Sequence, residues 1–160
     1  MSDVFPSDDT LPHEQHMAHA REQLSALLDQ LLKKAPGTTG ALLGANDGLK
    51  MAWTAGQPVD GADSLAAVIS GLYSLGRGYF KDTAGGIRQV VVEHDGGSLF
   101  VMSAGAKFKN PKAVDSVLAV VATPDADPGQ VGHEMLSFIQ GLEEVLVVRA
   151  RTNPFSGSGL

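Results

Sequence analysis

Residues 88–102 read RQVVVEHDGGSLFVM. Both halves of this stretch are rich in β-branched and aromatic residues, which favour strands. Between them lies Asp95-Gly96-Gly97, whose residues tolerate the positive φ angles of a tight turn. The stretch therefore predicts a β-hairpin with strands over 87–94 and 98–104.

Three further strands are predicted on either side of this hairpin. Residues 39–45 and 49–54 flank Asn46-Asp47-Gly48 and form a second predicted hairpin. Residues 116–122 are almost continuously apolar, which is typical of a strand buried on both faces. Because the links inside both hairpins are short, we expect an antiparallel sheet.

Three helices complete the predicted order α-β-β-α-β-β-β-α, which indicates an α+β domain. The first begins at about Glu14 and ends at Lys33-Lys34, before Pro36-Gly37. The second runs from about Asp60, with Asp63 as its capping partner, to about Lys81. The third opens at Asp127-Pro128-Gly129-Gln130, with Asp127 as its cap, Pro128 at the first helical position and Gln130 three residues after the cap.

The middle helix has two different faces, because its residues 65–78 read LAAVISGLYSLGRG. At about 100° per residue, the bulky side chains gather on one face, which we expect to meet the core: Leu65, Val68, Ile69, Leu72, Leu75 and Tyr79. The small residues lie nearly opposite, where another backbone could approach closely: Ala67, Ser70, Gly71, Ser74 and Gly78. An alternative interpretation is that Gly76 and Gly78 only mark an early helix end.

Composition limits the class of function. A chain of 160 residues is the size of one domain, and we expect it to span 13–148 between a disordered tail at 1–12 and a flexible tail at 149–160. A net charge of −6 argues against nucleic-acid binding. The longest apolar stretch, 114–122, has strand length, so no membrane insertion is expected. The absence of cysteine and of a signal-like start predicts a cytoplasmic protein.

No catalytic, cofactor or metal site is predicted, and we therefore expect no enzyme. The chain has no P-loop, and no nucleophile, base and acid can be assembled. The spacing of His13, His16 and His19 drifts around a helix and does not match the zincin pattern. Helix capping explains Asp125 and Asp127 better than calcium binding does. Residues 105–112, with three lysines at 107, 109 and 112, predict an exposed basic loop.

Several ordered segments together resemble the roadblock/LC7 domain family. They are residues 41–49 (ALLGANDGL), the helix 65–78, residues 88–93 (RQVVVE) and residues 97–102 (GSLFVM). Residues 118–127 with 131–135 are similar to the branch encoded in actinobacterial conservon-type operons. The resemblance spans residues 24–146.

This resemblance implies a five-stranded antiparallel sheet sandwiched by helices, in a homodimer whose third strands pair edge to edge and whose second helices lie together. It also implies regulation or scaffolding of a Ras-like small GTPase, in a pathway with a sensor histidine kinase-like protein. The expected dimer interface consists of Ala67, Ser70, Gly71, Ser74, Gly78, Ile87, Gln89 and Val91. Arg77 and Lys81 are the candidate GTPase-facing residues.

The alternative function is a small-ligand sensor resembling PAS or GAF domains, which also combine an antiparallel sheet with helices. It would use an apolar pocket around Trp53, Phe100 and Met102, although such residues more often form plain core.

Overall fold

The elements of the chain follow the predicted order. The computed structural model describes residues 11–45, 47–56, 58–104 and 116–152, without the side chains of 11–14, 16–17 and 143–152. The elements are α1 (Leu11–Lys34), β1 (Thr38–Ala45), β2 (Lys50–Trp53), α2 (Val59–Tyr79), β3 (Gln89–His94), β4 (Gly97–Ser103), β5 (Ser116–Ala122) and α3 (Pro128–Thr152).

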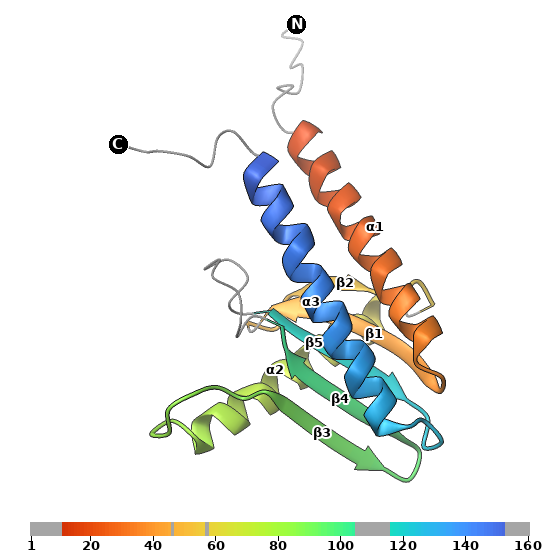
Figure 1. Cartoon of the computed structure of the whole chain (residues 1–160), viewed down its shortest axis with the longest axis vertical. Helices are drawn as coiled ribbons and strands as arrows, with labels where there is room; N and C mark the ends of the chain where they lie inside the picture. Colours follow the sequence, from red (N-terminus) through yellow and green to blue (C-terminus); the bar gives the residue numbers. More distant parts are fainter. Residues whose placement is uncertain (1–10, 46, 57, 105–115, 153–160) are drawn as a thin grey trace, which may run out of the picture.

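The five strands form one antiparallel sheet in the order β2-β1-β5-β4-β3. The strand β5 lies at the centre and is buried along nearly its whole length, as its continuous apolar sequence predicts. Helices α1 and α3 lie side by side across one face of the sheet, and α2 covers the other (Figure 1). The sheet is therefore sandwiched by helices, and β2 and β3 are its edges.

Alternation along each strand divides the core between the two faces. One buried cluster fills the space under α1 and α3 and includes Phe100, Leu118 and Met135. The other lies under α2 and includes Leu42, Ile69 and Val101. The prediction of a two-sided sheet with helices on both faces is confirmed.

The prediction for the core-facing side of α2 is wrong in part. The residues that meet the sheet most closely are Ala62, Ala66 and Ile69. Val68, Leu75 and Tyr79, expected in the core, are 50%, 75% and 83% exposed. Ile69 and Val68 differ by one step of about 100° around the helix, so one sheet cannot bury both rows. The structure selects the row in which two alanines allow the helix backbone to approach the sheet.

Three helix boundaries differ from expectation. Helix α2 begins at Val59 after Pro58, and no side chain caps its first turn, so the predicted capping pair does not form. Instead, Asp63 makes an ion pair with Lys50 of β2. Helix α1 already begins at Leu11, and α3 continues to Thr152, into the segments predicted as tails. Residues 1–10 and 153–160 lie outside the described residues.

The cap of α3 forms only in part as predicted. The Asp127 carboxylate accepts a hydrogen bond from the Gly129 N–H (3.0 Å), and the Asp127 carbonyl accepts one from the Val131 N–H (3.0 Å). Gln130, expected to complete a capping box, donates instead to the Lys34 carbonyl at the end of α1 (3.1 Å). The Gln130 side chain is directed to α1 because α3 begins beside the end of α1.

The turn after α1 depends on a glycine. Gly37 has a φ of +87°, and a Cβ there would lie 2.9 Å from the Cβ of Ala126. We expect Gly37→Ala to lower the free energy of unfolding by about 2–4 kcal/mol, from left-handed strain plus overpacking. Urea unfolding measures this. Gly132→Ala, where a Cβ would meet nothing within 4 Å, is the control, and an equal effect in the two variants would contradict the argument.

Candidate interaction surface

The edge strand β2 is protected against pairing with another strand. It has only four residues, and its pairing with β1 is interrupted by an irregularity between Leu43 and Gly44. Trp53 lies beneath two cations, with Arg21 5.4 Å and Lys50 5.0 Å from the ring centroid. Because Arg21 belongs to α1, this contact holds the helix beside the strand.

The other edge strand, β3, is open. Within the described residues it pairs only with β4. Val91 is opposite Phe100 and lies on the α1/α3 face, whereas Val92 is opposite Leu99 and lies on the α2 face. Both valines are exposed, by 43% and 40%. A strand edge with apolar side chains on both faces is a template for strand addition.

A row of small residues runs along the outer side of α2. Ala67, Gly71, Ser74 and Gly78 are exposed at helical spacing. A Cβ added at Gly71 or at Gly78 would meet nothing within 4 Å, so nothing among the described residues covers this row. The exposed Leu75 of the bulky row is its neighbour around the helix. The exposed side of the helix therefore carries both this row of small residues and large apolar side chains.

Two predicted interface residues have contacts inside the chain. Ser70 is half-buried next to the β1–β2 turn, where its side chain lies 3.7 Å from the position of a Cβ on Gly48. Ile87 is half-buried against Gly76, with 3.2 Å between its side chain and the position of a Cβ there. Gln89, by contrast, is exposed at the start of β3. The candidate self-association surface is therefore the edge of β3 together with the α2 row Ala67, Gly71, Ser74 and Gly78.

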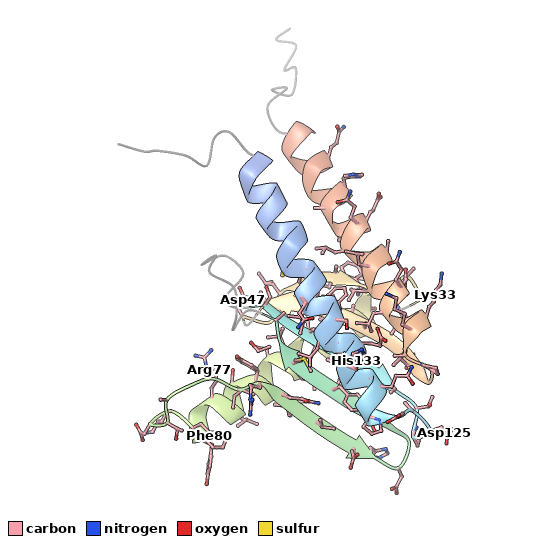
Figure 2. The ribbon with its side chains drawn as sticks, viewed as in Figure 1. Lys33, Asp47, Arg77, Phe80, Asp125 and His133 are labelled. Atoms are coloured by element: carbon pink, nitrogen blue, oxygen red, sulfur yellow. The ribbon has the colours of Figure 1, made fainter. Side chains whose placement is uncertain are left out.

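The candidate partner-facing cations lie at one end of this surface. Arg77 and Lys81 are exposed at the carboxyl end of α2, and the Arg77 guanidinium lies 5.9 Å from the centroid of the Tyr73 ring. Figure 2 shows Arg77 and Phe80 at this end, far from Lys33 at the end of α1. Both cations line an open groove, and Arg88 and Leu136 line it as well. The sequence did not identify these last two residues as part of a site. Only the fold brings residues so far apart in the chain together.

The apolar pocket expected for a sensor domain is not assembled. Phe100 and Met102 are buried in the α1/α3 cluster, whereas Trp53 packs against the α2 cluster on the other side of the sheet. The three side chains therefore cannot line one cavity.

The remaining polar candidates have local roles or lie outside the described part. His94 Nδ1 accepts a hydrogen bond from the Gly96 N–H (2.9 Å). His19 contacts Gln23 (3.1 Å), and no group of metal-ligating side chains occurs among the described residues. None of the described helices is long and apolar enough to cross a bilayer. The predicted basic loop 105–112 lies outside the described residues.

Comparison with known proteins identifies the family that has this architecture. The family model for the Roadblock/LC7 domain matches residues 24–122. A crystal structure of a Roadblock/LC7 domain from Streptomyces avermitilis is 38% identical, with a TM-score of 0.67 over 77% of this chain and 97% of that one. A second such domain from the same organism is 28% identical, with a TM-score of 0.59 over 74% of this chain and 97% of that one.

More distant structures share the fold alone. MglB from Myxococcus xanthus is 19% identical and has a TM-score of 0.65 over 79% of this chain and 96% of that one. No curated protein sequence gives a significant match. Together with the sheet order and the two helical layers, the family match and the Streptomyces likeness establish that this chain belongs to the Roadblock/LC7 family.

Proposed function

We propose that this protein is a cytoplasmic, non-catalytic homodimer that regulates or scaffolds a Ras-like small GTPase, in a bacterial signalling system of the actinobacterial conservon type. The observation that carries the dimer is that the β3 edge and the small-residue row of α2 are both uncovered among the described residues, and that α2 contacts β3. Strand pairing and helix contact with a second copy would cover both.

The side chains of β3 favour one register for this pairing. Directly opposite residues in an antiparallel pair share a face, so a two-fold axis can pass through Val90, Val91 or Val92. The axis at Val91 places Val90 opposite the partner's Val92, and Gln89 opposite the partner's Glu93. An axis at Val92 would place Val91 opposite a glutamate, and one at Val90 would place Val92 opposite an arginine. The axis at Val91 keeps apolar groups together and pairs an amide with a carboxylate.

Cysteine cross-linking tests the dimer and its register. The chain contains no cysteine, so Val91→Cys introduces a single thiol. On the axis, the two Cα atoms would lie about 4.5–5.5 Å apart, within the range of a disulfide. We expect rapid oxidation to a covalent dimer, read on a non-reducing gel.

The control for this experiment is Met51→Cys on the protected edge. Met51 is 40% exposed, close to the 43% of Val91, so the two thiols are similarly accessible. Equal cross-linking of the two variants, or a monomeric parent chain in light scattering, would reject the proposed dimer.

The GTPase role rests on the family membership and on the exposed surface beside the proposed dimer seam. We infer that any acceleration of GTP hydrolysis arises from ordering of the GTPase switch regions and not from a catalytic group supplied by this chain. Arg77 and Lys81 are the proposed contacts. A sensor histidine kinase-like protein would be a further member of the same system.

A pull-down with a neighbouring Ras-like GTPase, loaded with GDP or with GTP, tests this role. We expect one nucleotide state to bind preferentially, and Arg77→Ala/Lys81→Ala to weaken that binding. Single-turnover GTP hydrolysis with the same proteins separates regulation from scaffolding. Failure to bind in both nucleotide states, with the dimer intact, would overturn the GTPase role alone.

A further inference from the structure

The groove at the end of α2 has an apolar floor. Its volume is about 1230 Å³, and it lies between the end of α2, residues 80–88, the start of β3 and α3. Met102, Ala104 and Ile139 form buried parts of its lining. Phe80 and Leu136, also in the lining, are 51% and 46% exposed. An apolar ligand group could therefore be covered on entering the groove.

The charge of this groove is opposite to that of the chain. Arg77, Lys81 and Arg88 line it, and no acidic residue is among the lining residues that the structure describes. The whole chain has 18 Asp and Glu against 12 Lys and Arg. Within the described part of the chain, the one salt bridge joins Lys50 to Asp63, elsewhere in the molecule. These three cations thus form a local positive site on an acidic protein, which favours an anionic ligand.

The size of the groove indicates a polypeptide and not a small molecule. Ligand pockets usually enclose about 300–1,000 Å³ and bury most of their ligand. This groove is larger and open, and one wall contains Gly85 and Gly86, where a Cβ would meet nothing within 4 Å. A low wall of this kind leaves room for a peptide backbone.

We propose that this groove binds an acidic segment of a partner protein, with apolar side chains on the floor and carboxylates against Arg77, Lys81 and Arg88. The positive charge of the groove indicates an acidic occupant. Its concave apolar floor indicates that this occupant is a protein segment. The groove shares Ser74 and Gly78 with the self-association surface, so the bound segment would lie beside the dimer seam. The inference does not depend on whether the partner is a GTPase.

Fluorescence anisotropy with the full chain tests this site. The probe is a short fluorescein-labelled peptide in which glutamates alternate with leucines and alanines, and the same peptide with lysines is its counterpart. We expect the acidic peptide to bind and the basic one not to bind. Lys81→Glu/Arg88→Glu should weaken the acidic peptide by about tenfold or more, since each reversal replaces an attraction with a repulsion.

The matched control is Lys33→Glu/Lys34→Glu, which makes the same charge change on exposed residues at the end of α1 (Figure 2). It should change peptide affinity by no more than about twofold, as expected for distant solvated charges. Thermal melts verify that both variants are folded.

Four results would overturn the proposal, and three of them concern binding. They are absence of acidic-peptide binding to the parent chain, an equal loss in both double variants, and binding of phosphatidylserine vesicles in place of the peptide. A shift of Lys81→Glu/Arg88→Glu to monomer in light scattering would also overturn it, because a second copy would then be the occupant. Cross-linking through Val91→Cys tests the proposed dimer, and the GTPase pull-down tests the proposed GTPase role. Both are measured independently of peptide binding to the groove.

Discussion

Replacing Gly71 with leucine should abolish self-association and leave the monomer folded. In the single chain a Cβ at Gly71 meets nothing within 4 Å, so the larger side chain enters open space. Removing a glycine from a helix interior should raise helix stability by up to about 1 kcal/mol. In the proposed dimer the same side chain would hold the two α2 helices apart and open the β3 seam.

Light scattering and a thermal melt measure the two effects separately. We expect the mass of Gly71→Leu to fall to that of one chain, while the far-UV circular dichroism remains that of the parent. Gly141→Leu on α3 is the control, because Gly141 is also exposed and a Cβ there meets nothing within 4 Å. This control should remain a dimer. A dimeric Gly71→Leu protein would show that the small row of α2 is not the contact.

Replacing Phe100 with alanine should produce the largest loss of stability of any change considered. Phe100 is 1% exposed and lies in the cluster under α1 and α3. It is opposite Val120 on one side and Val91 on the other, so it joins the centre of the sheet to the open edge. Truncating a buried phenylalanine lowers the free energy of unfolding by about 3–5 kcal/mol, from lost burial and the cavity that remains.

Urea unfolding monitored by circular dichroism at low protein concentration measures this loss. In a thermal melt of the same variant, we expect the Tm of a domain of this size to fall by roughly 10 °C. Leu136→Ala, on the helix α3 that covers this cluster but 46% exposed, should change stability by less than about 1 kcal/mol. Similar losses in the two variants would contradict the described core. Because Phe100 lies opposite Val91 in the β3–β4 pair, the dimer should also weaken.

Local sequence determined the elements and their order. The turn residues Asp95-Gly96-Gly97 define one hairpin, and the pairs from Gln89–Met102 to His94–Gly97 follow from that turn. Gly37 ends the connection after α1 because only glycine takes its φ without strain. Signals of this kind act over a few residues, so they can be identified without the fold. The family resemblance supplied the expected dimer and GTPase role, which local patterns do not contain.

Only the tertiary structure decided which row of α2 meets the sheet. Leu75 and Tyr79 are as apolar as core residues, but the sheet accepts the row of Ala62, Ala66 and Ile69. A helix with more than one apolar row has no internal preference among them, and the surface it packs against makes the choice. The groove has the same origin, since Arg88 and Leu136 line one groove only after β3 and α3 are placed. Periodicity orders residues around one element, whereas a site between elements depends on how their backbones approach one another.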